Sequence, residues 1–201
     1  MKKKLTTIIA LILTIAAAVF FGDTTKTARI YDNNINTVSY TDLGVLTEGQ
    51  ELSQQFTCMQ DSIDGIMMKT GVAGDHDDAV VTLTITDADT GQVLYNTEEK
   101  GSQFRPRKIH YFRTSHFEKM KGRSLIVTVS ESGSASGNGI TFYYTGQDQA
   151  ESFASLDGET LPGVLPMGTA VDGFDIETFL VFLFSVWFIW GFMWFLYKLF
   201  Q

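Results

Sequence analysis

Hydrophobic and polar residues alternate along four stretches in the central part of the chain. The positions that share one side of each stretch are Leu52, Gln54, Phe56 and Cys58; Val81, Leu83 and Ile85; Leu125, Val127 and Val129; and Ile140, Phe142 and Tyr144. Successive side chains of a strand point to opposite faces, so a period of two residues predicts strands that bury one face. We therefore expect the central part of the chain to be built from strands.

Turn residues divide this pattern into short elements. Residues 80–97 predict a hairpin, because two alternating runs flank the turn sequence Asp-Ala-Asp-Thr-Gly at 87–91, whose glycine can adopt a positive φ. Further strands are expected over residues 63–70, 109–113 and 38–46. About eight short strands joined by turns are typical of an all-β sandwich, and we expect the jelly-roll type.

Both ends of the chain are apolar. Residues 5–21 carry no charge and follow three lysines at 2–4, which is typical of a signal anchor or of a signal peptide. The alanines at 16–18 offer a cleavage site, but the apolar run continues past them, so we favour an anchor and keep cleavage as the alternative. Residues 179–197 are almost entirely apolar and long enough to predict a transmembrane helix.

These features predict four parts. Residues 1–22 form the signal anchor or signal peptide, 23–146 an extracytoplasmic β-sandwich, 147–176 a linker rich in glycine and proline, and 177–198 a transmembrane helix. Basic residues next to membrane spans favour the cytoplasm. Both termini are therefore expected in the cytoplasm of a bacterial cell, with short tails that leave no room for a cytoplasmic domain.

The charge of the chain excludes some partners. All 23 acidic residues but only 11 of the 15 basic ones lie between the two apolar ends, which gives this part a net charge of −12. An acidic surface of this kind argues against nucleic acid as a partner, because affinity for phosphates rests on basic residues. The single cysteine, Cys58, excludes an internal disulfide framework, and we expect a buried thiol, with an intermolecular disulfide as the alternative.

Basic residues nevertheless gather in one part of this acidic segment. Eight of them lie between positions 100 and 123, against the single acid Glu118: Lys100, Arg105, Arg107, Lys108, Arg113, Lys119, Lys121 and Arg123. We call these eight residues the basic band. It can face anionic lipid, cell-wall polysaccharide or an acidic partner surface, or it is a solvated surface that balances nearby acids. The candidate binding residues are Arg105, Arg107, Lys108, Arg113, Tyr111 and Tyr143.

Other candidate chemistry is sparse. Asp75, Asp77 and Asp78 form an acidic loop that could hold a structural Ca²⁺, but their spacing does not fit an EF-hand, so solvated turns are favoured and no cofactor is expected. The chain lacks the common catalytic motifs, and its three histidines are expected to be structural or solvent-exposed. We therefore predict no catalytic residue and no enzymatic activity.

Three tryptophans share one side of the C-terminal apolar segment. Trp187, Trp190 and Trp194 follow helical spacing. They predict either contact with lipid at the membrane interface or a face that pairs with the helix of another membrane protein. Neither apolar run contains Asp, Glu, Lys, Arg or His, so an ion pathway formed by this chain is not expected.

The strand segments also carry a resemblance. The stretches LTEGQELSQQFTCMQDSIDGIMMKTG, VVTLTITDADTGQVL, KGRSLIVTVS and GNGITFYYTG, with Gly49, Gln54, Phe56, Gly65 and Ile66, look like the sandwich modules found between transmembrane segments in Gram-positive membrane proteins of cell-surface polysaccharide assembly. In such proteins the module accompanies a large multi-spanning glycosyltransferase body, which this sequence lacks. The resemblance implies a non-catalytic accessory subunit with a multi-spanning membrane partner. The alternative is a free-standing tethered module that binds a glycan or a wall polymer.

Overall fold

The computed structural model describes residues 2–30, 40–145 and 152–201, with side chains from residue 7 onward. It divides into two compact units. One is built from strands and spans Thr27–Val171, and the other combines Met1–Lys26 with Asp172–Gln201 and is mainly helical.

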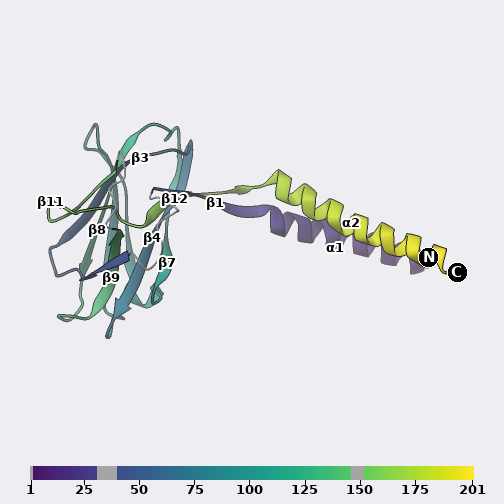
Figure 1. Ribbon diagram of the computed structural model, residues 1–201, viewed down its shortest axis with the longest axis horizontal. Coiled ribbons are helices and arrows are strands. Elements are labelled where there is room, and N and C mark those ends of the chain that lie inside the picture. The colour runs from purple at the N-terminus through teal and green to yellow at the C-terminus, as the bar shows by residue number, and fades with distance from the viewer. Residues whose placement is uncertain (1, 31–39, 146–151) are drawn as a thin grey trace. The chain divides into compact units, whose positions relative to one another are not determined.

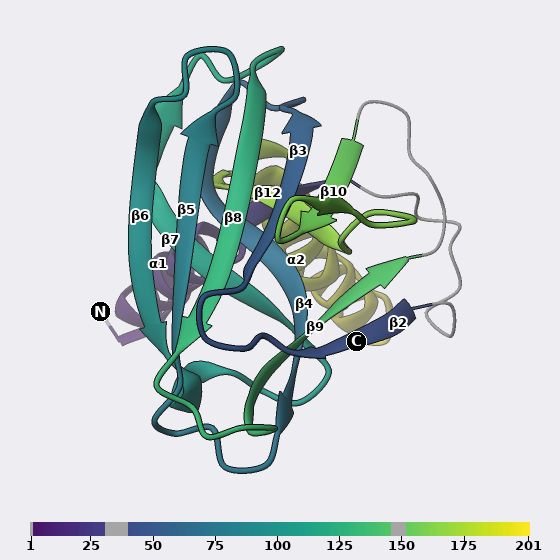
Figure 2. The same ribbon diagram turned by 90° about the vertical axis from the view of Figure 1, so that its left-hand side faces the viewer.

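The strand unit consists of two antiparallel sheets, which confirms the predicted sandwich at that level. In sheet 1 the order is β1-β12-β4-β9-β2, and β7 pairs with the other edge of β4; in sheet 2 the order is β11-β10-β3-β8-β5-β6 (Figures 1 and 2). The bounds are β1 Asp23–Arg29, β2 Tyr40–Val45, β3 Glu51–Thr57, β4 Ser62–Ala73, β5 Val80–Asp87, β6 Val93–Lys100, β7 Lys108–Glu118, β8 Ser124–Ser132, β9 Gly139–Thr145, β10 Ser152–Leu156, β11 Glu159–Thr160 and β12 Met167–Phe174.

The alternating residues form the core between the sheets. Buried and partly exposed residues alternate without interruption along β5, and Leu83 lies opposite Val129 of β8 in the same buried layer. Phe56, Phe112 and Phe142 are among the largest fully buried side chains. The predicted strands over 63–70, 109–113 and 38–46 correspond to β4, β7 and β2, although residues 38 and 39 lie outside the described residues.

The predicted hairpin over 80–97 is present as β5, a tight turn and β6. Asp87 organises the turn: its Oδ1 accepts hydrogen bonds from the Thr90 N–H at 2.8 Å and from the Thr90 hydroxyl at 2.9 Å. Its Oδ2 accepts two more from the Arg123 guanidinium, at 2.5 and 3.1 Å. These bonds favour the charged carboxylate and lower the pKa of Asp87 to about 2.

The low pKa of Asp87 predicts acid sensitivity. An unfolded aspartate titrates near 3.9, so the folded state binds fewer protons, and the contribution of Asp87 is present above about pH 4 and lost as the pH falls through 2. We expect Asp87→Asn to lower the melting temperature of the full chain in non-ionic detergent at pH 6 and to flatten its decline between pH 4 and 2. Thermal unfolding followed by circular dichroism measures both, and an unchanged acid slope in the variant contradicts the assignment.

The prediction of a linker over residues 147–176 is wrong for residues 152–176, the part of it that the structure describes. Residues 146–151 lie outside the described residues, but β10, β11 and β12 follow them and belong to the two sheets. β10 pairs with β3, and β12 pairs with the first half of β4. The sandwich therefore extends well beyond the predicted boundary at residue 146.

Buried contacts hold this returning segment in place. Gln54, which alternates inward from β3 with Leu52 and Phe56, donates from its amide to Ser152 at 2.9 Å and accepts the Leu165 N–H at 2.5 Å. Leu165 and Met167 are buried in the core. A buried amide requires such partners, because an unpaired polar group in the core is costly. The polar residue of the alternating run thus anchors the segment predicted as a linker.

The helical unit contains α1, Lys2–Gly22, and α2, Ile176–Leu199. The two helices run alongside each other (Figure 1), and the rings of Phe21 and Phe182 stack at 4.7 Å. Asp175 caps α2 by accepting hydrogen bonds from the Glu177 and Thr178 N–H groups. Among the described residues α2 alone is both long and apolar enough to cross a membrane, whereas Thr7–Gly22 of α1 is a shorter apolar helix.

Candidate functional site

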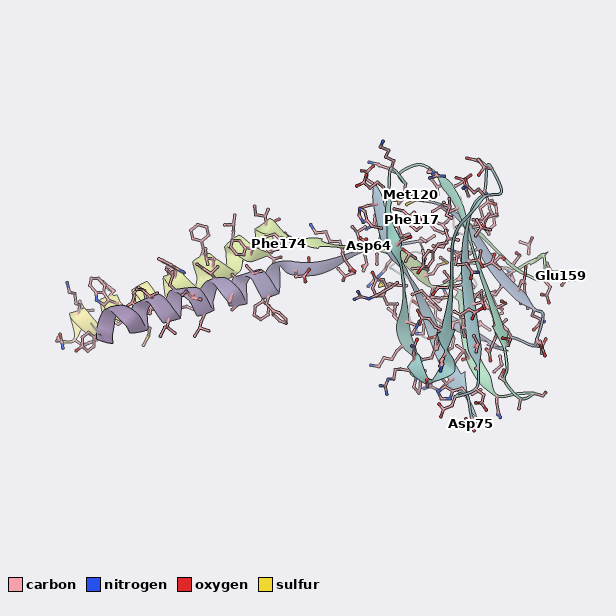
Figure 3. All side chains as sticks on the ribbon, turned by 180° about the vertical axis from the view of Figure 1, so that it is seen from behind. Asp64, Asp75, Phe117, Met120, Glu159 and Phe174 are labelled. Carbon is pink, nitrogen blue, oxygen red and sulfur yellow. The ribbon has the colours of Figure 1, made fainter. Side chains whose placement is uncertain are left out.

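The structure does not gather the basic band into one patch. Arg105 and Arg107 precede β7 and Lys108 is its first residue, whereas Lys119, Lys121 and Arg123 follow it. Because Lys108 pairs with Thr70 of β4 and Glu118 pairs with Ser62, eight strand steps of about 3.3 Å hold these two groups about 26 Å apart. Figure 3 shows Phe117 and Met120 at one end of the sandwich and Asp75 at the other.

Arg123 of the basic band forms an ion pair with the Asp87 carboxylate. At the other end, the loop that carries Asp75, Asp77 and Asp78 packs against Gly101, whose N–H donates to the Ala79 carbonyl at 2.7 Å. Arg105 follows Gly101 by four residues. The ion pair fits the solvated-surface interpretation for Arg123, whereas Arg107 lies close enough to Lys69 to lower the pKa of that lysine.

A different group of predicted residues does come together, on the outer face of sheet 1. Tyr111 and Arg113 of β7 point away from the core, because Phe112 between them is buried. Tyr143 of β9 lies on the same outer face, as do Tyr40 of β2 and Lys69 of β4. We call Tyr40, Lys69, Tyr111, Arg113 and Tyr143 the tyrosine face. The sequence indicated three of its residues as binding candidates, but not Lys69.

Two glycines of β4 make room for the rings. A Cβ atom at Gly65 would overlap the Tyr111 ring, and one at Gly71 would overlap the hydroxyl groups of Tyr143 and Thr141. Neither glycine has a positive φ, so the backbone conformation does not require glycine at either position. The glycines instead allow the tyrosines to lie across the strand, a pairing that compensates for the weak strand propensity of glycine.

Cations lie against the rings of the tyrosine face. The Lys69 ammonium is 4.2 Å from the centroid of the Tyr40 ring and 5.6 Å from that of Tyr143, and the Arg113 guanidinium is 5.5 Å from that of Tyr111. These are cation–π distances. Partial burial and the nearby positive charge of Arg107 lower the pKa of Lys69. The face is thus both aromatic and positively charged.

Two of the histidines have structural partners, consistent with their predicted roles. The His110 ring stacks on Phe104 at 3.9 Å and lies 2.6 Å from the Glu99 carboxylate, which joins β7 to β6. His116 is exposed, and its Nδ1 lies 2.7 Å from Asp64, a contact that raises the pKa of His116. His76 lies in the loop of Asp75, where its Nδ1 is 3.2 Å from the Gly74 carbonyl.

Cys58 is buried, as predicted, and burial raises the pKa of its thiol. Asp75, Asp77 and Asp78 are exposed at a turn. Within residues 2–30, 40–145 and 152–201, no three His, Cys, Asp or Glu side chains gather closely enough to hold a metal ion.

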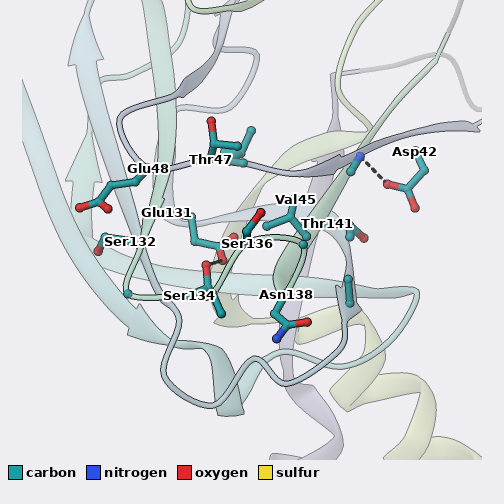
Figure 4. A pocket seen from close by; sticks show the side chains of 16 residues that line it. Asp42, Val45, Thr47, Glu48, Glu131, Ser132, Ser134, Ser136, Asn138 and Thr141 are labelled. Carbon is teal, nitrogen blue, oxygen red and sulfur yellow. Dashed lines mark hydrogen bonds between the residues drawn. The ribbon is translucent and has the colours of Figure 1, made fainter.

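A polar hollow of about 660 Å³ lies at the end of the sandwich, between the β2–β3 connection and the loop of residues 133–138 (Figure 4). Glu131 is buried at its wall and accepts hydrogen bonds from the Ser134 hydroxyl at 2.7 Å and the Ile140 N–H at 3.0 Å. Burial raises the pKa of Glu131, and these bonds oppose the rise. The Glu131 carboxyl group thus links the loop of residues 133–138 to β9, which is a structural role.

The tryptophans lie on α2, and two of them border α1. Trp187 and Trp190 line a hollow of about 340 Å³ between the helices, together with Thr7, Ala10, Leu11, Thr14 and Val186. Trp194 lies beneath Lys198, whose ammonium is 4.7 Å from its ring. All three rings remain at least half exposed, so a surface for contact outside the helix pair is present.

Comparisons with known proteins give only distant likenesses. No family model and no curated protein matches the chain. Among solved structures, the infectious bursal disease virus VP2 subviral particle matches 75% of this chain at 8% identity and a TM-score of 0.28, and the Gt strain of that virus matches 77% at 15% identity and 0.23. The chain spans 42% and 35% of those two proteins. Likenesses at these TM-scores carry no inference about function.

Proposed function

We propose that this chain is a non-catalytic membrane protein whose β-sandwich, of the jelly-roll type, works outside the cytoplasmic membrane of a bacterium. It acts as an accessory subunit of a multi-spanning protein of cell-envelope polysaccharide synthesis or export. α1 serves as a signal anchor and α2 as a second span, so that both termini lie in the cytoplasm. The sequence resemblance to modules of polysaccharide assembly supports this role, and so does the character of the helical unit.

The observation that carries the proposal is the apolar surface of the paired helices. α2 contacts α1 along one side, yet it presents many exposed large apolar side chains: Phe184, Trp187, Phe188, Ile189, Trp190, Phe192, Met193, Trp194 and Phe195. A surface of this size is not stable in water, because each exposed apolar side chain costs free energy. Lipid and a partner helix are the environments that suit it.

The distribution of charge supports the orientation. Lys198 lies in the last turn of α2, and Asp172, Asp175 and Glu177 lie before or within its first turn. Basic residues next to a span favour the cytoplasmic side. The C-terminus is therefore assigned to the cytoplasm and the sandwich to the outside.

Partner capture tests the accessory role. We expect gentle extraction of the full chain in mild detergent, followed by mass spectrometry, to recover a stoichiometric multi-spanning protein of polysaccharide assembly. Replacing Trp187, Trp190 and Trp194 together with Leu should remove at least nine-tenths of this partner, because the aromatic contact surface is lost while the helix stays apolar. The matched control replaces Phe184, Phe188 and Phe192 with Leu, on another side of α2, and should retain the partner.

A second function is favoured by the tyrosine face. A free-standing module, tethered to the membrane and binding a glycan or wall polymer, needs exposed aromatic rings and polar groups on a rigid surface, and sheet 1 offers both. A chain that is extracted alone, and is unaffected by the tryptophan replacements, supports this second function over the accessory role.

A further inference from the structure

The tyrosine face combines features that define a class of ligand. We propose that it binds an acidic polysaccharide, with the apolar face of a sugar ring against Tyr143 and the carboxylate of that sugar at Lys69. This inference rests on the glycan-binding function proposed above and names the ligand class of that surface. It is carried by the glycines under the rings, the position of the cations and the length of the face.

The glycines show that the rings are held in a fixed position. Tyr143 and Tyr111 lie across Gly71 and Gly65, so each ring rests on the strand rather than projecting from it. A ring held in this way loses little conformational entropy when it binds, and its aromatic surface accepts the C–H groups of a sugar. Rings that lie along the sheet fit a flat ligand and lack the protruding shape of a membrane-inserting side chain.

The cations indicate that the ligand is negatively charged. The strand unit lies in the acidic part of the chain, yet Lys69 and Arg113 lie on this face beside three tyrosine rings, with Arg107 close to Lys69. The ring contacts hold both cations in place, which lowers the cost of binding an anion. Asp42 of β2 is the acid beside Tyr143, and it accepts the Gly44 N–H at 2.8 Å. Lys69 is therefore the anion contact nearest to Tyr143.

The length of the face indicates a polymer. Gly65 and Gly71 are six residues apart on β4, which corresponds to about 20 Å along the strand. The Lys69 and Tyr143 pair lies near one end of this span and the Tyr111 and Arg113 pair near the other. The exposed side chain of Ile109 continues the apolar surface on β7, beside Lys69. Arg113 lies opposite Gly65, so the cations of the two pairs are four residues apart along β4, or about 13 Å. Two cation and tyrosine pairs at this separation fit an oligosaccharide of two or more sugars better than a single sugar.

Binding to the full chain in neutral phosphatidylcholine nanodiscs tests the inference. The probes are cellohexaose and the β-1,4-linked glucuronate hexamer, which share backbone and linkage and differ only in the carboxylate. We expect calorimetric titration to show binding of the glucuronate hexamer at least tenfold tighter than that of cellohexaose, with an affinity that falls as salt rises. Equal binding of the two hexamers, or no binding of either, overturns the proposal.

Variants assign the binding to this face. Lys69→Gln should remove the preference for the acidic hexamer, while Lys121→Gln, beyond the far end of β7, should keep it. Tyr143→Ala should weaken binding about tenfold and Tyr143→Phe should preserve it, because stacking needs the ring and not its hydroxyl. Gly71→Ala keeps every contact residue but displaces the Tyr143 ring, so it should match Tyr143→Ala while the melting temperature stays within a few degrees. Unchanged binding in both Tyr143→Ala and Gly71→Ala contradicts the site.

Two further outcomes separate this proposal from the others. If the nanodisc-held chain binds phosphatidylglycerol vesicles through Lys69 but neither hexamer, the face contacts lipid and the glycan proposal fails. If the chain is extracted without a multi-spanning partner but still binds the glucuronate hexamer, the accessory role is contradicted and the glycan proposal is not. The binding experiment and the partner capture therefore fail independently.

Discussion

Phe142→Ala is expected to lower the free energy of unfolding by about 3–5 kcal/mol. Phe142 is 0% exposed, and its backbone is paired with β2 on one side and β4 on the other, so the backbone cannot readily move inward to fill the cavity left by the ring. Such a loss is a large share of the stability of a single domain, which is about 5–15 kcal/mol.

Urea unfolding of the full chain in non-ionic detergent, followed by near-ultraviolet circular dichroism, measures this loss. Phe153→Ala is the matched control, because Phe153 is 64% exposed on β10, and its replacement should change the free energy by about 0.5 kcal/mol or less. A Phe142→Ala protein that unfolds within about 1 kcal/mol of the wild type, well below the range of about 3–5 kcal/mol for a buried phenylalanine, contradicts the assigned core.

Two charges in the middle of α2 are expected to prevent it from spanning a membrane. Phe188 and Ile189 lie near the centre of α2 and are 72% and 61% exposed. An aspartate at the centre of a span costs about 2.5–3.5 kcal/mol, so Phe188→Asp with Ile189→Asp costs about 5–7 kcal/mol. This penalty lowers the equilibrium constant for insertion of the helix into the membrane by several orders of magnitude.

The position of the C-terminus reports this shift. An epitope tag placed after Gln201 should be hidden from antibody in intact bacterial spheroplasts for the wild type and exposed for the double aspartate variant. Phe188→Leu with Ile189→Leu is the control and should keep the tag hidden. A tag that stays hidden in the aspartate variant contradicts the spanning role proposed for α2.

The sandwich strands were predictable because alternation is a strong local signal. Along β3, β5 and β8 one face is buried, so the inward residues repeat every second position. The later strands were not predicted, since β10 and β11 have five and two residues and glycine and proline surround them. One local signal was present: Asp157 and Gly158 both have positive φ and form the two-residue turn between β10 and β11.

The tyrosine face was only partly predictable, because it depends on strand pairing rather than on a local sequence pattern. Tyr111, Arg113 and Tyr143 stand out in the sequence as aromatic and basic residues in strands, but their grouping depends on which strands are neighbours. Lys69 is a single basic residue on β4, and only the pairing of β4 with β7 and β9 brings it between the tyrosines. Conversely, the basic band is continuous in sequence and divided in space, because β7 separates its ends.

The most direct test of the account is the side of the membrane on which the sandwich lies. The chain has one cysteine, which is buried, and Cys58→Ser removes it, so a cysteine introduced elsewhere is the single thiol that a maleimide can label. A new cysteine at exposed Ser136, Ser136→Cys, is then treated with a membrane-impermeant maleimide in intact bacterial cells. The account predicts full labelling before the cells are lysed. Labelling that occurs only after lysis places the sandwich in the cytoplasm and contradicts it.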